Sequence, residues 1–301
     1  MARLVNEYKV VAVIGLNDSS YALAAGPIAQ KAGITFLTSG ATLPSLPIEV
    51  GNCMLLTAFG DDAQAYAVAS YASKALGART AWVLTDSSSD FTLALANFFI
   101  EKFKELAGMN AILLEDSYHT GDRDFSAQIG RLKAIRPQPD LLMISALPSD
   151  CGAIAKQVRD AGIEKPIVSG DGFDTPLLVK LAGRGSRNVF FATHVSLENK
   201  SPVVQDFKKA YKKEYGHFPE NAFATLGYDS LRLIATAIKK ADGIQPSAIR
   251  DELAHIKGFM GVTGTISYAT GKRVPKKSVT IIKVFDKEFR FAEEIAPSQL
   301  R

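Results

Sequence analysis

The sequence is poor in the residues that mark disulfide-rich, metal-binding and membrane proteins. It has two cysteines, Cys53 and Cys151, in 301 residues. Because neither stands in a metal-ligand spacing, we expect two buried free thiols. The four histidines lie far apart without metal spacing, so neither a metal nor another cofactor is expected. No apolar run reaches the roughly 18 residues that a membrane-spanning helix needs.

The motifs of the common α/β enzymes are also missing. The chain has no G-x-S-x-G, no G-x-x-x-x-G-K-S/T and no G-x-G-x-x-G after a predicted strand. Acyl transfer, nucleotide hydrolysis and dinucleotide binding therefore lack their usual marks. An enzyme that uses Asp86, Asp90 and Asp171 as acid–base groups is an alternative, but it needs a nucleophile or metal that the sequence does not supply. We predict a protein that catalyses no reaction.

The net charge and the N-terminal residues further restrict the expected partners and targeting signals. The formal net charge is +4, and the lysines are scattered or grouped on solvated helix faces, so no nucleic-acid partner is expected. The first seven residues include Glu7 and lack the apolar core of a signal peptide. We therefore expect the export signal to be absent from this chain.

Short β-branched runs alternate with helical periods along most of the chain, which is typical of crossover units on parallel sheets. After residue 193 three helical segments follow in a row, which suggests a change of lobe, and the length suffices for two α/β lobes. Strands are predicted at residues 9–15, 34–38, 53–59, 80–85, 110–115, 140–145, 166–169, 188–193, 263–268, 279–285 and 289–291. Helices are predicted at residues 20–32, 61–76, 91–107, 125–135, 150–161, 202–215, 221–241 and 246–255.

Small and hydroxyl side chains follow the first two predicted strands. In open parallel sheets, ligands bind beyond the carboxyl ends of the strands. Ser19 and Ser20 stand at a helix start, where hydroxyls and backbone N–H groups suit a carboxylate. Ala41 and Thr42 lie in a loop of small residues that lets a ligand approach the backbone. Helix capping is the alternative explanation of the serines.

Two later loops carry an acid and aromatic side chains. Asp171 lies between two glycines after the strand at residues 166–169, and it can pair with an ammonium group. Phe91 or Phe173 can supply an apolar wall. Together with the first two loops this combination suits an α-amino acid, although an ordinary turn acid is the alternative for Asp171.

Four stretches follow one another in an order that is more specific than any single motif. They are Val11-Ala12-Val13-Ile14-Gly15 with Ser19-Ser20, Ser39-Gly40-Ala41-Thr42-Leu43-Pro44, Asp86-Ser87-Ser88-Ser89-Asp90-Phe91, and Gly170-Asp171-Gly172-Phe173-Asp174-Thr175-Pro176. This order resembles the leucine/isoleucine/valine-binding proteins of ABC transporters from about residue 3 to residue 291. The resemblance implies a type I periplasmic-binding fold, in which two Rossmann-like lobes with parallel sheets, joined by three segments, close on a solute. The first lobe is expected at residues 1–59 with 197–257, and the second at 60–196 with 258–301.

The resemblance also implies roles for particular residues. The carboxylate-binding serine of the family corresponds to Ser19, helped by Ser20, and its small loop corresponds to Ala41 and Thr42. The family's acid that pairs with the ligand ammonium corresponds to Asp171, an aspartate where the family carries a glutamate.

Two further positions depart from the family. Phe91 stands where a tyrosine is more usual, and a second tyrosine position falls on Ala146 or Leu147. Because these changes alter pocket size and remove hydroxyl donors, they bear on ligand identity. The implied ligand is a branched-chain or other apolar amino acid. The alternatives are a small aromatic carboxylate and a sensor of amino acids or amides with the same fold.

The resemblance implies a membrane permease as partner and a periplasmic or other extracytoplasmic location. The family begins with a strand, a helix and a second strand before the segment that matches residues 3–15, so we expect the first lobe to be incomplete. Open strand edges are usually covered by pairing, and self-association through this lobe is therefore expected.

Overall fold

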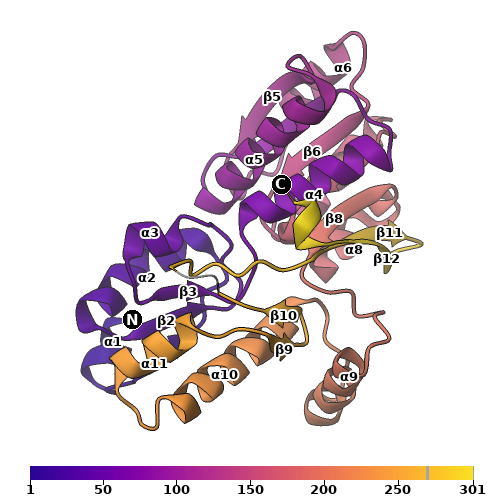
Figure 1. Ribbon diagram of the computed structural model, residues 1–301. Coiled ribbons are helices and arrows are strands. Elements are labelled where there is room, and N and C mark those ends of the chain that lie inside the picture. Colours follow the sequence, from indigo (N-terminus) through magenta and orange to yellow (C-terminus); the bar gives the residue numbers. More distant parts are fainter. Residues whose placement is uncertain (269–270, 301) are drawn as a thin grey trace. The chain divides into compact units, whose positions relative to one another are not determined.

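The computed structural model describes residues 1–268 and 271–300 and divides the chain into two compact units (Figure 1). Unit 1 comprises Met1–Gly60 and Asn199–Ser278, and unit 2 comprises Asp61–Glu198 and Val279–Arg301. The chain passes between the units three times, as the three-segment connection predicts. The run of three predicted helices coincides with the return to unit 1.

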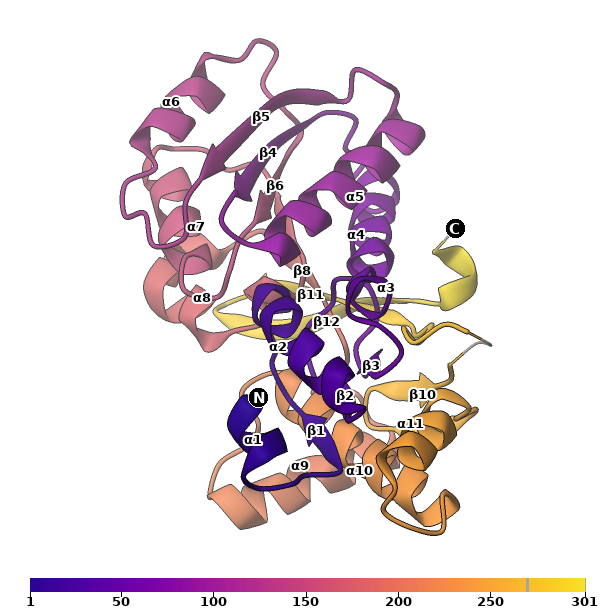
Figure 2. The same ribbon diagram turned by 90° about the vertical axis from the view of Figure 1, so that its left-hand side faces the viewer.

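Unit 1 is built on a parallel three-stranded sheet in the order β1-β2-β3, with helices on both faces (Figures 1 and 2). A separate antiparallel pair, β9 and β10, joins it late in the sequence. Its elements are α1 (Ala2–Asn6), β1 (Ala12–Ile14), α2 (Ser19–Ala32), β2 (Thr35–Thr38), α3 (Leu46–Val50), β3 (Met54–Leu56), α9 (Pro202–Tyr215), α10 (Phe223–Lys240), α11 (Pro246–Ala254), β9 (Phe259–Gly261) and β10 (Gly264–Ile266).

The central strands of unit 1 are apolar on both faces, because successive side chains of a strand point in opposite directions. Phe36 and Leu56 pack with Ala22 of α2, whereas Leu37 packs on the other face with Leu233 of α10. Burial on both faces is what a parallel sheet between helices requires, and it explains the uninterrupted apolar runs of the sequence.

Residues 258–278 belong to unit 1, and not to the second lobe as expected. The hydroxyl of Tyr268 donates to the carbonyl oxygen of Leu56 at 2.8 Å. Asp229 on α10 accepts hydrogen bonds from the backbone N–H and the hydroxyl of Thr263 at 2.9 and 2.8 Å. These bonds tie the β9–β10 pair to the first sheet and to α10, so the last boundary falls after residue 278. The other two boundaries lie within two residues of the expected ones.

A buried lysine completes this part of unit 1. The ammonium group of Lys277 donates to the carbonyl oxygen of Thr57 at 3.3 Å and to the hydroxyl of Thr263. Burial lowers the pKa of Lys277 from 10.5 to about 8, and the attraction of Asp229 opposes that shift. The charged form of this lysine is therefore penalised in the folded chain.

This burial predicts a pH-dependent contribution to stability. Between about pH 8 and pH 10.5 the unfolded chain binds the Lys277 proton and the folded chain does not, so the free energy of unfolding rises with pH. We expect the free energy of unfolding of the wild-type chain, minus that of Lys277→Met, to rise by about 2 kcal/mol from pH 8 to pH 10. Urea denaturation at several pH values measures this difference, and parallel pH profiles would show that Lys277 keeps its proton when folded.

Unit 2 is built on a seven-stranded sheet in the order β12-β11-β8-β7-β6-β4-β5. The strands from β8 to β5 in this order are parallel to one another, and β11 is antiparallel to both of its neighbours, β8 and β12. Helices α4 and α5 cover one face, and α6, α7 and α8 cover the other (Figure 2). The elements are α4 (Asp61–Lys74), β4 (Ala81–Asp86), α5 (Asp90–Ala107), β5 (Ile112–Tyr118), α6 (Ser126–Ala134), β6 (Leu141–Ser145), α7 (Cys151–Asp160), β7 (Ile167–Ser169), η1 (Asp171–Phe173), α8 (Pro176–Ala182), η2 (Gly183–Ser186), β8 (Val189–Thr193), β11 (Val279–Phe285), β12 (Glu288–Ile295) and η3 (Pro297–Gln299).

Both cysteine thiols are free and buried, as the sequence predicts. Cys53 lies in unit 1 and Cys151 in unit 2. Burial raises the pKa of the Cys151 thiol to about 12, so this residue packs as a small apolar side chain. None of the helices within residues 1–268 and 271–300 is both long enough and apolar enough to cross a bilayer.

Candidate functional site

In unit 1, the loop after β2 is tied to the start of α2. The Ser19 hydroxyl accepts a hydrogen bond from the backbone N–H of Leu43 at 3.2 Å. The Thr38 hydroxyl donates to the carbonyl oxygen of Ala41 at 3.2 Å, which closes the loop on the end of β2. Ser19, Ala41 and Thr42 are all buried. The structure therefore brings these three predicted residues together at the carboxyl end of the parallel sheet.

The N-terminus of α2 is capped by Asp18. Its carboxylate accepts hydrogen bonds from the backbone N–H groups of Ser20 and Tyr21 at 2.9 and 3.2 Å. The backbone N–H of Ser20, which the sequence suggested for a ligand carboxylate, is thus engaged within the chain. Capping explains this turn.

Gly40 is required by the close packing of the same loop. A Cβ at this position would lie 2.8 Å from the ring of Phe223 and 2.9 Å from the side-chain oxygen of Asn17. That oxygen also accepts a hydrogen bond from the Ser39 hydroxyl at 2.7 Å. The loop is therefore fixed against α10, so its backbone is held in one position before a ligand arrives.

In unit 2, the loop after β7 touches two other predicted site residues. A Cβ on Gly172 would lie 2.2 Å from the carbonyl oxygen of Ala146 and 3.3 Å from the ring of Phe91. Ala146 follows β6 and Phe91 lies in the first turn of α5, after β4. Because β7, β6 and β4 are neighbours in the sheet, the structure gathers Phe91, Ala146 and Asp171 at one edge.

Asp171 is 2% exposed, and its carboxylate is held by two side chains. Its Oδ2 atom lies 3.0 Å from Nε2 of His194, and its Oδ1 atom accepts a hydrogen bond from Nε2 of Gln64 at 3.2 Å. The backbone N–H of Asp171 donates to Oε1 of Gln64 at 2.9 Å. Sequence reasoning missed both partners. His194 had a usable signal, since it directly follows the predicted strand at residues 188–193.

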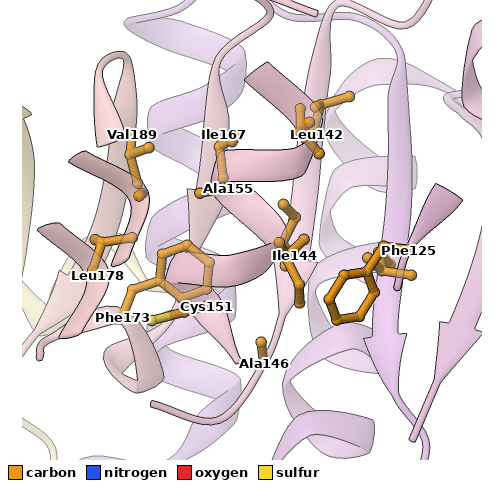
Figure 3. Close-up of a cluster of buried hydrophobic side chains, with 14 of the residues drawn as sticks. Phe125, Leu142, Ile144, Ala146, Cys151, Ala155, Ile167, Phe173, Leu178 and Val189 are labelled. Carbon is orange, nitrogen blue, oxygen red and sulfur yellow. The ribbon is translucent and has the colours of Figure 1, made fainter. Parts of the chain in front are cut away.

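Phe173 is one of the two aromatic side chains that the sequence suggested for an apolar wall of the site. Its ring is fully buried in the core of unit 2 (Figure 3). Cys151 of α7 and Leu178 of α8 belong to the same cluster. The ring anchors the loop to the core, and Phe91 is the aromatic side chain that packs against Gly172 of the same loop.

The acid–base alternative finds no support in the geometry. Asp86 accepts hydrogen bonds from the backbone N–H of Ser88 at 2.9 Å and from the hydroxyl of Thr120. Both of its oxygens therefore brace the loops after β4 and β5. Among the residues that the structure describes, no three His, Cys, Asp or Glu side chains gather as metal ligands would.

Unit 1 has small-residue loops and unit 2 has an acidic loop at the carboxyl ends of their parallel strands, which is where open α/β sheets bind small solutes. The model of the periplasmic binding protein family matches residues 1–288. The chain belongs to this family, and the resemblance inferred from the sequence is confirmed.

Solved structures agree with this assignment. The leucine binding protein LivK of Thermotoga maritima MSB8 is 31% identical, with a TM-score of 0.92, and the match covers 99% of this chain and 83% of that one. The branched-chain amino acid transporter substrate binding protein LivJ of Streptococcus pneumoniae, in complex with isoleucine, is 30% identical with a TM-score of 0.88, covering 98% and 82%. These matches confirm the predicted type I periplasmic-binding fold.

A relative found by sequence similarity agrees with the family assignment. The Leu/Ile/Val-binding protein homolog 3 of Brucella melitensis biotype 1 is 24% identical over 272 residues, which are 90% of this chain and 72% of that protein.

Proposed function

We propose that this chain is the extracytoplasmic solute-binding component of an ABC transporter and that it binds an apolar α-amino acid without changing it chemically. The observation that carries this proposal is the buried Asp171 at the carboxyl end of β7, in a loop whose Gly172 packs against Phe91 and Ala146. A fixed, buried anion beside apolar groups suits a ligand with an ammonium group and an aliphatic side chain.

The proposed roles follow the chemistry of the two loops in each unit. Ser19, Ser20, Ala41 and Thr42 of unit 1 are proposed to hold the ligand carboxylate through hydroxyl and backbone groups. Asp171 of unit 2 is proposed to hold the ammonium group. The closed state is stabilised to the extent that the solute has a higher affinity for it than for the open state.

Phe91 and Ala146 are proposed to receive the ligand side chain. Their contact with the Asp171 loop supports this role. Neither side chain can donate a hydrogen bond, so an aliphatic side chain is favoured over a polar one, whose hydroxyl would be left without a partner.

Thermal unfolding against a panel of ligands tests the proposed function. A ligand that binds the folded state alone raises the midpoint, by about 2.7 kcal/mol of stability at a hundredfold excess over Kd, which is roughly 5 °C for a chain of this size. We expect this shift with leucine, isoleucine or valine. Benzoate and aliphatic amides are the comparison ligands, and a shift with them alone would favour an aromatic-acid binder or an amide sensor.

The proposed partner is a membrane permease, and the family assignment supports this partner and an extracytoplasmic location. A sensor of the same fold would have no permease. Co-purification of the permease with the ligand-loaded chain distinguishes the two roles.

We also propose self-association through the outer edge of β1. This strand pairs with β2 and with no other strand of the described chain, and such an edge presents N–H and C=O groups that pair readily. Light scattering is expected to show a species larger than 32.4 kDa. A monodisperse monomer at high concentration would contradict this proposal.

A further inference from the structure

We propose that Gln64 and His194 are positioning residues that fix the Asp171 carboxylate as a receptor for a primary ammonium group. This inference rests on the proposed function and deepens it, because it names the feature that selects amino acids over plain carboxylates. All three residues belong to unit 2, and they come from α4, η1 and the end of β8.

Gln64 holds Asp171 at two points. Its Oε1 atom accepts the backbone N–H of Asp171 at 2.9 Å, and its Nε2 atom donates to the carboxylate at 3.2 Å. The same Nε2 donates to Asp61 in the first turn of α4 at 2.8 Å. A Cβ on Gly170 would lie 2.6 Å from Oε1 of Gln64, so glycine at this position lets the amide reach the loop. The backbone and the carboxylate of Asp171 are therefore fixed together.

His194 holds the other carboxylate oxygen. Its Nε2 atom lies 3.0 Å from Oδ2 of Asp171, and its side chain is fully buried. A carboxylate has about four lone-pair positions on its two oxygens, so one contact on each oxygen leaves positions for a ligand ammonium. A carboxylate that is oriented before the ligand arrives loses less conformational freedom on binding.

The charge of the two partners decides what Asp171 can bind. The Gln64 amide carries no charge, and the His194 imidazole in its neutral form donates a proton from Nε2 without one. Hydrogen bonds from these uncharged forms leave the full negative charge of the carboxylate for the ligand. An arginine or lysine in either place would neutralise Asp171 and remove its attraction for an ammonium group.

Substitutions at two positions, on different elements, test this role against a structural one. His194→Leu removes the Nε2 donor, and His194→Gln retains an amide donor on a side chain of similar reach. Gln64→Glu keeps the shape of the side chain but turns an acceptor toward Asp171 where a donor stood. Calorimetric titration measures the affinity of each variant for L-leucine and for isocaproate, which has the same side chain and carboxylate but no ammonium group.

We expect His194→Leu and Gln64→Glu to lower the affinity for leucine roughly tenfold or more, as for a lost hydrogen bond to a charged group. The affinity for isocaproate should change by less than about threefold, and His194→Gln should restore most of the leucine binding. This inference alone would be overturned if both variants kept the wild-type affinity for leucine. It would also be overturned if each variant lost affinity for leucine and isocaproate by the same factor. A wild-type chain that binds none of the amino acids would overturn the proposed function as well. Circular dichroism identifies a variant that fails to fold, and the variant on the other element then carries the test.

Discussion

An Asp171→Ala variant is expected to bind leucine or isoleucine at least about a hundredfold more weakly than the wild-type chain. The substitution removes the buried carboxylate that we propose to pair with the ligand ammonium group. It also leaves the donors of Gln64 and His194 without the acceptor they now have, which adds a desolvation cost. Calorimetric titration of both proteins with the same amino acid measures the loss.

Two further variants separate charge from loop structure. Asp171→Asn keeps the shape of the side chain and removes its charge, so it should lose most of the affinity that Asp171→Ala loses. Asp174→Asn alters another buried acid of the same loop, which accepts a hydrogen bond from the Thr193 hydroxyl at 2.6 Å, and it should bind nearly as the wild type does. If Asp171→Asn kept its full affinity, Asp171 would have no place in the site.

Gly172→Ala is expected to destabilise unit 2 by about 3 kcal/mol and to abolish ligand binding. The added Cβ would lie 2.2 Å from the backbone oxygen of Ala146, so the clash is with the main chain at the end of β6. The loop must then move, and Asp171 moves with it. Urea denaturation measures the loss of stability, and the ligand-induced thermal shift reports the loss of binding.

Gly130→Ala is the matched control in the same unit. A Cβ there, within α6, meets no atom within 4 Å, so alanine should stabilise the helix by about 0.5–1 kcal/mol. Wild-type stability and affinity in Gly172→Ala would show that the loop lies farther from β6 than the structure places it.

The elements with a clear period could be predicted from the sequence. The helix expected at residues 91–107 is α5 (Asp90–Ala107), and the strand expected at 279–285 is β11 (Val279–Phe285). The elements that were missed have seven residues or fewer, and they are α1, α3, α8, β9 and the 3-10 helices η1, η2 and η3. Such lengths show too little periodicity to distinguish a helix or strand from a loop.

The last lobe boundary depends on contacts that no local pattern contains. Tyr268 and Leu56, which join residues 258–278 to the first sheet, are 212 positions apart. The three strands predicted at the end of the chain looked alike in the sequence. They differ in the sheet to which they belong, and no local pattern in the sequence shows this difference.

Part of the candidate site could be predicted from the rule that ligands bind beyond the carboxyl ends of parallel strands. That rule identified Asp171, Phe91 and the loop after β2, and it would also have identified His194, which follows β8. Gln64 lies in a helix and 107 positions from its partner, so the rule does not apply to it. The burial of Phe173 in the core of unit 2 could not be predicted either, because neighbouring residues of a short turn point in different directions.

The order of strands in unit 2 has a consequence for biosynthesis. β8 pairs with β11, and the 80 residues of unit 1 from Asn199 to Ser278 separate the two in the chain. During translation the edge of β8 therefore stays exposed until residues 279–285 have left the ribosome. Because a sheet edge that waits in this way pairs readily with other chains, chaperones that shield nascent chains should matter more for this protein than for one whose lobes are continuous in sequence.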